Sequence, residues 1–572
     1  MHVTGLVRLT GTTSVLASGA NAYLRLISTA TAFASVNPLN AGSSITGDVK
    51  VESWLTGGTL DLRHTRMLSP PVNDNYTLAG NKIYQQLKNQ LVITGPDGNV
   101  NGFDPGNASQ PNAVTLTRYN EPNTLMQSQF APIPSLTDAM VPVVNPGEGF
   151  FLFYRGNRGG YTTITNLTSN KVNQPFAVPE SFAVTYQGRL NQGNIAATLN
   201  RTPNAEIYDG FNVIGNPYPA SIDFTQLSIN NSAAIENYYV IVKPDKSGIM
   251  SYSAASGTVT NGSPFATNST ARYIQSAQAF YIVKKVNGTE TFSNFFTESI
   301  KATANLPARL LAVPFGRNLQ TLTSMSLTPL VSVKSNPWPL LRMSLQDDIN
   351  IDEAAVLFRK GYRKEYEGSD VPYFSGSTVS LSTLSADEKS LAINFMPDLK
   401  EMTIIKLAVY AQNSGLFKLS FFELPACLPS QKMFLKDSLY PDRLTELKLN
   451  LSYSFIIDKN ISNTFGTDRF KIALINEKKL VVKKPSAVKI ATLISYPNPF
   501  TDKFVIKIND KIKGGMKLLI TSIQGRNVKE FDFEVNENLT VDLSGYQSGM
   551  YAVELRSAMS GRILGRSIII KN

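Results

Sequence analysis

Residues 496–508 read Y-P-N-P-F-T-D-K-F-V-I-K-I, a proline-rich turn followed by a strand with alternating apolar side chains. Phe504, Ile506 and Ile508 share one face of that strand, because successive strand residues point to opposite faces. Three further runs alternate in the same way, 518–520, 531–535 and 551–555, and residues 567–571 form the predicted final strand. Together with the turn residues between them, these runs predict a small sandwich of about seven strands over residues 493–572.

The chain as a whole has the composition of a large globular β-protein. Its 572 residues suffice for roughly three or four domains. Asn, Thr, Ser and Gly are abundant and the apolar runs are short, a pattern typical of strands joined by turns. The predicted fold class is therefore all-β and multidomain. No run approaches the roughly 18 consecutive apolar residues of a membrane helix, so we expect no transmembrane segment.

Changes in composition divide the chain into four parts. The fraction of charged residues rises after residue 300, which suggests a domain boundary. We predict a β-rich region at 1–300, which could contain two subdomains, and a β-sandwich at 301–477. Residues 478–492 hold five lysines and no acid and are predicted to be a linker. The C-terminal module at 493–572 follows.

The distribution of charge argues against a nucleic-acid partner. The net charge is +11. Residues 1–300 nevertheless carry 18 Lys and Arg against 17 Asp and Glu, and residues 301–477 carry 20 against 18. A nucleic-acid-binding protein concentrates basic residues on one face. We therefore expect no nucleic-acid partner and interpret the lysines of 478–492 as solvated.

Few residues could carry nucleophilic or metal chemistry. The chain has two histidines, His2 and His64, and one cysteine, Cys427. This leaves little basis for a histidine triad or a histidine–metal site, and none for an internal disulfide. We interpret Cys427, in L-P-A-C-L-P, as a small buried hydrophobic residue. We predict no catalytic residues, although two carboxylates alone would suffice for a glycosidase.

One loop has a weak calcium signature. Asp97, Asn99 and Asn101 alternate in D-G-N-V-N-G, and short oxygen-bearing side chains at this spacing suit a hard cation. The twelfth position of a calcium loop, where a bidentate Glu is expected, is Ala108. We therefore favour an Asx-rich turn, keep calcium as an alternative, and predict no other cofactor.

Two charged clusters allow two interpretations each. Arg63, His64 and Arg66 could form a basic site, but we favour a strand that ends at the following Pro-Pro turn. The acidic residues of 347–353 could bind calcium, but we favour a solvated loop between strands.

Two stretches of the N-terminal region resemble each other. Residues 143–153 read V-V-N-P-G-E-G-F-F-L-F and residues 274–283 read I-Q-S-A-Q-A-F-Y-I-V, each a polar turn that leads into an aromatic strand. Between them, residues 215–219 read G-N-P-Y-P, which predicts a rigid turn because two prolines fix φ. This set is similar to a β-rich region of large secreted Bacteroidetes proteins, with Ala277 and Ala279 where glycines are usual.

The C-terminal module resembles a type A C-terminal sorting domain of the type IX secretion system of Bacteroidetes. The matching positions run through the whole module: Tyr496, Pro497, Asn498, Pro499 and Phe500 at its start, Gly525 in I-Q-G-R-N-V, Asp542 and Leu543, Gly549 and Tyr551 in S-G-M-Y, and Lys571 near the end. The resemblance implies a type IX cargo protein that is secreted or displayed at the cell surface.

The same resemblance implies partners. The outer-membrane translocon would recognise the folded module, and a sortase-like C-terminal signal peptidase would remove it. The product would then be released or attached to surface lipopolysaccharide. A flexible linker would give the peptidase access to extended backbone, so we predict cleavage within about residues 478–496. The start, M-H-V-T-G-L-V-R-L-T, does not read as a signal peptide, so we expect a longer N-terminal part.

The body of the chain fits two functions. We favour a non-catalytic adhesion or binding scaffold, because the sequence shows a near-neutral β-rich body and no catalytic constellation. The alternative is the non-catalytic C-terminal portion of a larger secreted hydrolase. A glycosidase within 1–300 is a third, weaker hypothesis.

Overall fold

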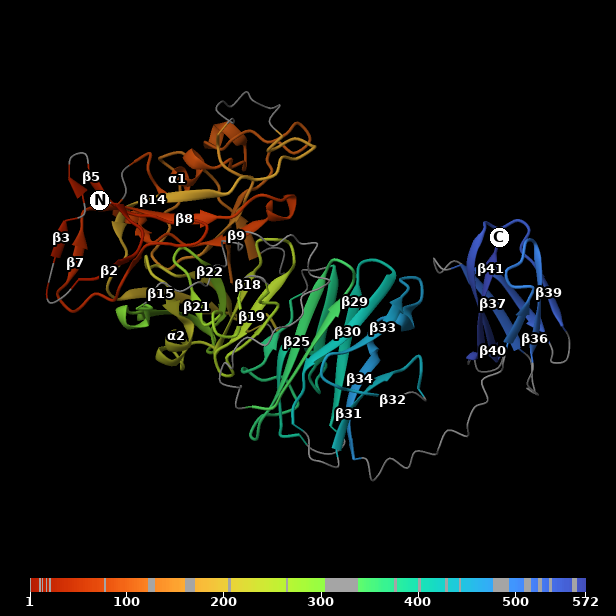
Figure 1. Cartoon of the computed structure of the whole chain (residues 1–572). Helices are drawn as coiled ribbons and strands as arrows, with labels where there is room; N and C mark the ends of the chain where they lie inside the picture. The colour runs from red at the N-terminus through yellow and green to blue at the C-terminus, as the bar shows by residue number, and fades with distance from the viewer. Residues whose placement is uncertain are drawn as a thin grey trace. The chain divides into compact units, whose positions relative to one another are not determined.

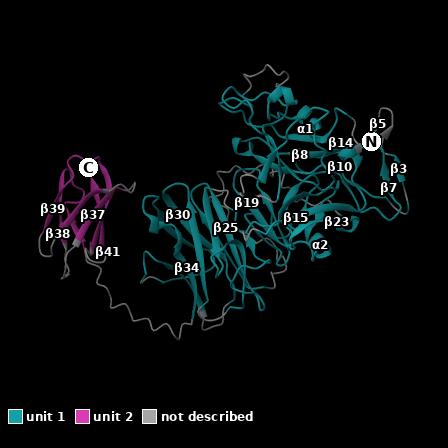
Figure 2. Ribbon diagram, turned by 180° about the vertical axis from the view of Figure 1, so that it is seen from behind, with its two compact units in different colours: residues 1–477 teal, residues 478–572 magenta. Residues whose placement is uncertain are grey.

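The computed structural model divides the chain into two compact units, residues 1–477 and 478–572 (Figure 2). It describes all residues except 1, 10–11, 13, 17, 20–21, 77–78, 122–128, 160–169, 204–206, 264–265, 304–337, 375–377, 400–402, 427–430, 442–443, 477–492, 509–515, 523–526, 534–537 and 558–562. Strands dominate both units, and the described residues include two α-helices, α1 (Ile83–Gln90) and α2 (Phe224–Asn230). The predicted all-β class is confirmed.

The N-terminal part of the first unit repeats one plan twice. In the first half, β8 (Asp48–Leu55) pairs antiparallel with β14 (Phe182–Leu190) (Figure 1). In the second half, β15 (Ile195–Arg201) pairs antiparallel with β23 (Gly288–Phe296). In each half, the second strand of the pair is the last strand of that half. The two paired strands are therefore separated in the sequence by the other elements of the half.

Each half also contains a strand that leads into a proline turn and then a short helix. In the first half, β9 (Thr65–Leu68) pairs with β13 (Phe150–Phe153) and precedes Pro70, Pro71 and α1. In the second half, β16 (Phe211–Gly215) pairs with β22 (Ala279–Val283) and precedes the G-N-P-Y-P turn and α2. The aromatic strands expected after the two related stretches are therefore β13 and β22.

The G-N-P-Y-P turn is held from the inside. Asn216 is fully buried, and its Nδ2 donates to the carbonyls of Ala220 at 2.7 Å and Ile274 at 3.0 Å. Its Oδ1 accepts from the backbone amide of Tyr218 at 3.0 Å. The Tyr218 hydroxyl in turn donates to the carbonyl of Gly193 at 2.5 Å. Buried polar groups that find such partners stabilise one conformation of the turn.

The two halves meet through their related motifs. Gly147 and Ala277 occupy equivalent positions, and both have positive φ, +82° and +65°. The carbonyl of Ala277 accepts from the amide of Ser69 at 3.0 Å, and the carbonyl of Gly147 accepts from the amide of Gly215 at 2.9 Å. Ser69 and Gly215 stand at equivalent ends of β9 and β16. Each half therefore donates one such hydrogen bond to the other half, and a pseudo-twofold axis relates the two bonds.

Gly215 lies where the two backbones come closest. A Cβ atom at this position would lie 2.0 Å from the Cβ of Ser69. No van der Waals contact between carbon atoms is that short. A glycine is therefore required for the two halves to approach this closely.

We expect Gly215→Ala to lower the free energy of unfolding by roughly 2–3 kcal/mol, because the added methyl group must push the two halves apart. Gly415→Ala is the matched control, since the nearest atom to a Cβ there belongs to Phe417 and is 3.7 Å away. Chemical denaturation of both variants measures the effect. A Gly215→Ala protein as stable as the parent would show that the contact between the halves is loose.

Residues 338–476 form one sheet of eleven strands (Figure 1). From one edge to the middle, its order is β33 (Leu451–Ile457), β30 (Gly415–Glu423), β24 (Leu340–Gln346), β25 (Ile351–Phe358) and β28 (Ser390–Met396). It continues with β27 (Val379–Leu384), β29 (Ile404–Ala411), β34 (Gly466–Asn476), β31 (Gln431–Asp437) and β32 (Leu444–Glu446), while β26 (Val371–Pro372) pairs with β28. Phe455 of β33 meets Phe470 of β34 with ring centroids 4.7 Å apart. The sheet therefore folds onto itself as a sandwich.

The hydrophobic core continues across the boundary expected near residue 301. One buried cluster contains Phe211 and Tyr281 from before that point and Leu357 and Phe395 from after it. The ring of Phe374 packs against the ring of Phe211, with centroids 5.0 Å apart. The repeated part and the eleven-stranded sheet therefore share one buried cluster within the first unit, beside clusters that belong to each part alone.

The acidic stretch 347–353 is not a solvated loop throughout. Asp352 lies inside β25 and is 3% exposed. Its carboxylate accepts from the hydroxyl of Tyr373 and the Nδ2 of Asn261, both at 2.6 Å, and from the amide of Leu381 at 2.7 Å. The expectation of a solvated loop is wrong for this residue, because β25 runs through the interior of the sheet.

Asp352 and Asp370 make stability depend on pH. Burial raises the pKa of Asp352 to about 6 and that of Asp370 to about 7, whereas an unfolded Asp has a pKa of about 3.9. The folded state therefore binds these protons more tightly, and the stabilisation present at low pH is lost as the pH rises through the folded pKa values.

We expect the free energy of unfolding to be lower at pH 8 than at pH 5, by on the order of 4 kcal/mol for both groups together. Urea denaturation across this range measures the slope. Asp370→Asn should make the slope shallower, because one of the two titrating groups is gone. A stability that rises from pH 5 to pH 8 would contradict the assignment.

The second unit is a two-layer sandwich. One sheet contains β35 (Leu493–Tyr496), β36 (Lys503–Ile508) and β39 (Leu539–Asp542). The other has the order β38 (Asn527–Phe533), β37 (Met516–Ser522), β40 (Gly549–Ser557) and β41 (Ile563–Lys571). Phe504 of the first sheet and Leu518 of the second lie in the core between them. The described residues thus contain seven strands, in agreement with the sandwich of about seven strands that the alternating pattern predicted.

Candidate functional site

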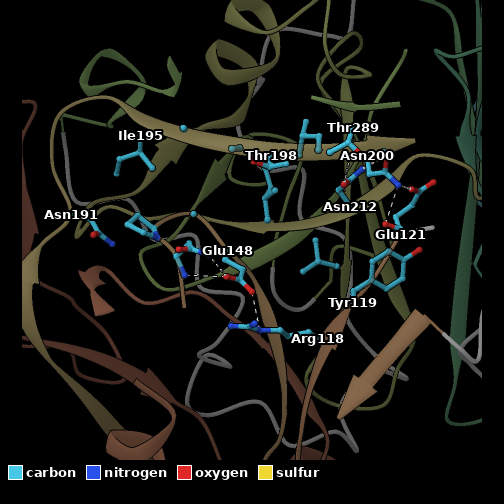
Figure 3. Close-up of a pocket in the computed structure, with 18 of the residues that line it drawn as sticks. Arg118, Tyr119, Glu121, Glu148, Asn191, Ile195, Thr198, Asn200, Asn212 and Thr289 are labelled. Carbon is cyan, nitrogen blue, oxygen red and sulfur yellow. Dashed lines mark hydrogen bonds and ion pairs between the residues drawn. The ribbon is translucent and has the colours of Figure 1, made fainter. Parts of the chain in front are cut away.

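A cavity of about 1060 Å³ lies in the first unit, and we call it the amide groove (Figure 3). Amide and hydroxyl side chains dominate its lining: Asn73, Asn120, Asn145, Asn191, Gln192, Asn194, Thr198, Asn200, Thr202, Asn212 and Thr289. Arg118, Glu121 and Glu148 add charge. These residues come from both halves of the repeat, so the groove exists only because the halves meet.

Glu121 is fixed at one end of the groove. Its Oε1 accepts from the backbone amides of Thr202 at 2.8 Å and Gly210 at 3.1 Å, and Asn200 Nδ2 donates to its Oε2. The Oδ1 of Asn200 accepts from the hydroxyl of Thr289 at 2.6 Å. Figure 3 shows this network where the strands β15 and β23 run side by side. The network holds the amide of Asn200 in one orientation.

An ion pair between Arg118 and Glu148 forms another part of the lining, with Nε and Oε1 2.9 Å apart (Figure 3). Arg118 also donates to the phenol oxygen of Tyr84 at 3.1 Å and to the carbonyl of Val143 at 2.5 Å. The Oε2 of Glu148 accepts from the backbone amide of Asn145 at 3.0 Å. The pair is thus anchored to the backbone on both sides, which makes it a rigid part of the wall.

This lining suits a hydroxyl-rich ligand. Side-chain amides and hydroxyls can both donate and accept hydrogen bonds, as sugar hydroxyls do. Glu121 and Glu148 accept from backbone amides, which fixes both carboxylates in the lining. These residues belong to no motif of the sequence that indicates a binding site. The amide-rich run N-Q-G-N at 191–194 was the signal available for them.

Arg63, His64 and Arg66 do not form one basic site. Arg66 is buried, and its guanidinium donates to five backbone carbonyls, the carbonyl of Leu62 at 2.7 Å among them. His64 Nδ1 lies 3.3 Å from the carbonyl of Lys243, and burial lowers the pKa of His64. These two residues are structural, while Arg63 lines a separate cavity.

The loop with the weak calcium signature is a turn around a short 3-10 helix (Gly98–Asn101). Asn101 Nδ2 donates to the Asp97 carboxylate at 3.2 Å, so these two side chains bind each other across the turn. Within the described parts of the chain, no group of three or more His, Cys, Asp or Glu side chains is placed to hold a metal ion. Calcium binding by Asp97, Asn99 and Asn101 stays an untested alternative to the favoured Asx-rich turn.

In the second unit, the Y-P-N-P-F motif clasps the last strand. Asn498 Oδ1 accepts from the amide of Ile570 at 2.8 Å, and its Nδ2 donates to the carbonyl of Ile568 at 2.9 Å. Phe500 is buried and forms a parallel bridge with Lys571. Tyr496, Pro497 and Pro499 complete this connection between β35 and β36. The motif therefore ties the start of the module to its end.

The remaining motif positions surround the turn between β39 and β40. The Lys571 ammonium donates to the carbonyls of Tyr546 at 2.5 Å and Ser544 at 3.4 Å. Asp542 Oδ1 accepts from the amide of Ser544 at 2.9 Å. Leu543 and Tyr551 lie in the core, and Gly549 begins β40 with a φ of +152°. Gly525, Cys427 and the predicted linker 478–492 lie outside the described residues.

We expect Asn498→Ala to lower the free energy of unfolding of the second unit by about 1–3 kcal/mol, because two backbone groups of β41 lose their partner. Secretion should fall with it, since the clasp holds the sorting domain together. Thermal melting and the secreted fraction measure the two effects. Thr501→Ala, at an exposed neighbouring position, is the control. An unchanged melting temperature for Asn498→Ala would contradict the role of the clasp.

Comparison with known families gives two matches. Residues 158–473 match the family described as "Domain of unknown function (DUF8693)", and residues 495–571 match the secretion system C-terminal sorting domain. No curated protein matches the chain. In the described parts of the chain, no helix is long and apolar enough to cross a membrane. The chain therefore belongs to the DUF8693 family, and its sorting domain makes it a cargo of the type IX secretion system that is secreted or displayed at the cell surface.

Proposed function

We propose that residues 1–477 are a non-catalytic binding scaffold, and that the amide groove engages a neutral, hydroxyl-rich ligand such as a saccharide outside the cell. The lining of the groove carries this proposal. Its amides and hydroxyls offer donors and acceptors side by side, and networks around Glu121 and Glu148 hold them in place. A pre-organised polar lining lowers the entropic cost of binding.

The proposal can be tested by filling the groove. Ala196 is exposed and lines the groove, so Ala196→Arg introduces a long side chain without removing a side-chain hydrogen bond. We expect this variant of the full chain to bind a neutral oligosaccharide, selected on a glycan array, at least about tenfold more weakly than the parent.

Ala386→Arg is the matched control, because Ala386 is exposed and belongs to the eleven-stranded part rather than to the groove. It makes the same chemical change and should leave affinity unaltered. If no neutral glycan on the array binds the parent, or if both variants bind equally well, the proposed role of the groove is wrong.

We further propose that a sortase-like peptidase removes the sorting domain after export, with release or attachment to surface lipopolysaccharide. The five lysines of 478–492 suggest a solvated segment open to cleavage. We expect mass spectrometry of the exported protein to place its C-terminus within about residues 478–496. Exported protein that keeps residues 497–572 would contradict processing.

A further inference from the structure

The strand β15 borders the amide groove with one of its edges. Among the described strands, β15 pairs with β23 alone, in a two-stranded sheet. Ala196, Thr198 and Asn200 of β15 all line the groove, and Figure 3 labels the last two. The edge of β15 that faces away from β23 is therefore covered by no described strand.

One side-chain amide already pairs with this edge. The backbone amide of Asn200 donates to Oδ1 of Asn212 at 2.9 Å, and the backbone carbonyl of Asn200 accepts from Nδ2 of Asn212 at 2.8 Å. Nδ2 also donates to the carbonyl of Gly210 at 2.7 Å, which holds the Asn212 amide in place. An amide group thus satisfies the edge of β15 at Asn200, in place of a neighbouring strand.

The backbone of Thr198 faces the same way as that of Asn200. In an antiparallel pair, residues whose backbone groups bond the partner strand alternate with residues whose backbone groups point away from it. Asn200 directs its amide and carbonyl away from β23, so Thr198, two residues earlier, does the same. Thr198 is exposed and lines the groove. Its backbone N–H and C=O are therefore offered to a ligand in the groove.

We propose that this edge of β15 binds the acetamido group of an N-acetylated saccharide, such as an N-acetylglucosamine unit of an extracellular polysaccharide. The acetamido carbonyl accepts from the backbone N–H of Thr198, much as the Asn212 carbonyl oxygen accepts from that of Asn200. The acetamido N–H points the opposite way and donates to an oxygen of the other wall, to which Asn120 and Asn145 contribute side-chain amides. This inference rests on the proposed function of the groove and names the sugar class that it takes.

The remaining lining agrees with a neutral sugar that carries a methyl group. The charged residues that line the groove are two glutamates and one arginine, Glu121, Glu148 and Arg118. This excess of negative charge disfavours an acidic sugar. Ala196, which is exposed, and Val213, which is half-buried, add apolar surface to the lining. The acetyl methyl group can pack on such surface, whereas a plain hydroxyl cannot use it.

An extended peptide also carries amide groups and can add to a strand edge. Strand addition needs a regular run of open backbone groups. In β15 this run is short, because Asn212 already pairs with Asn200 and because the ladder with β23 has a register shift between Ile195 and Ala197. The regular open part of the edge is limited to the surroundings of Thr198, which suits one acetamido group better than a strand.

Isothermal titration calorimetry of the full chain tests the ligand class. Chitotetraose is the probe, and cellotetraose is its match, because it has the same β-1,4 linkage with a hydroxyl in place of each acetamido group. We expect chitotetraose to bind saturably and at least about tenfold more tightly than cellotetraose. Equal affinities, or no binding of chitotetraose, would overturn this inference. A soluble octapeptide of alternating threonine and serine that binds as tightly as chitotetraose would overturn it in favour of strand addition.

These outcomes are separate from a failure of the proposed function. If chitotetraose shows no preference but another neutral glycan binds the parent and loses affinity in Ala196→Arg, the groove still binds saccharides and the acetamido assignment alone is wrong. If no neutral glycan binds the parent, both proposals are wrong.

A proline variant locates the contact. Thr198→Pro removes the backbone N–H at the open edge, where the ladder with β23 does not need it, and proline is tolerated at such edge positions. We expect this variant to bind chitotetraose about tenfold more weakly or worse, so that its preference over cellotetraose disappears. A Thr198→Pro protein that keeps the preference would overturn the inference.

Thr291→Pro is the matched control. Thr291 is exposed and lies directly opposite Thr198, so its N–H points away from β15, and it is not part of the described groove lining. Both variants lose the same contact between the two hydroxyl groups, which are 2.8 Å apart. Thr291→Pro should bind chitotetraose like the parent, and an equal loss in both variants would overturn the assignment to the β15 edge. Thermal melting identifies a variant that unfolds, in which case the comparison of the two tetrasaccharides on the parent decides.

Discussion

Two backbone hydrogen bonds at the pseudo-twofold axis hold the repeated part of the first unit together. Ser69 donates to Ala277, and Gly215 donates to Gly147. Buried backbone groups need partners, and these two bonds satisfy four such groups where the halves meet. The bonds are possible because Gly215 has no side chain and because two residues adopt positive φ. The amide groove follows from this contact, since each half supplies part of its lining.

The second half of the repeat also packs against the eleven-stranded sheet. β16 and β22 carry Phe211 and Tyr281, whose rings pack with Phe374 in the common core. A polar connection runs beside it, because Asn261 donates to the buried carboxylate of Asp352. A buried charge needs such donors. Residues 1–477 therefore behave as one unit in which packing and polar contacts reinforce each other.

The sequence predicted the features that depend on local pattern. Alternation revealed the strands of the sorting domain, because that sandwich has one buried face per strand. The two prolines of G-N-P-Y-P predicted a rigid turn. Features that depend on distant partners remained hidden. Asp352 lies in an acidic stretch that resembles a solvated loop in sequence. Its partners, the Tyr373 hydroxyl and the Asn261 amide, come from other parts of the chain. The groove pairs Glu121 with Asn200, 79 positions away, and no local signal connects them.

Charge counts along the sequence likewise do not predict which charged groups become neighbours in the folded protein. Counted along the sequence, residues 1–300 are almost neutral, which bears only on long-range attraction to a polyanion such as nucleic acid. Folding does not preserve this balance at short range. Arg66 donates to several backbone carbonyls, whereas Arg63 lies near Arg155, and burial together with this neighbour lowers the pKa of Arg63 to about 10. A region can thus be almost neutral by count and still bring like charges together, because burial strengthens charge interactions over a few ångströms and solvent screens them beyond.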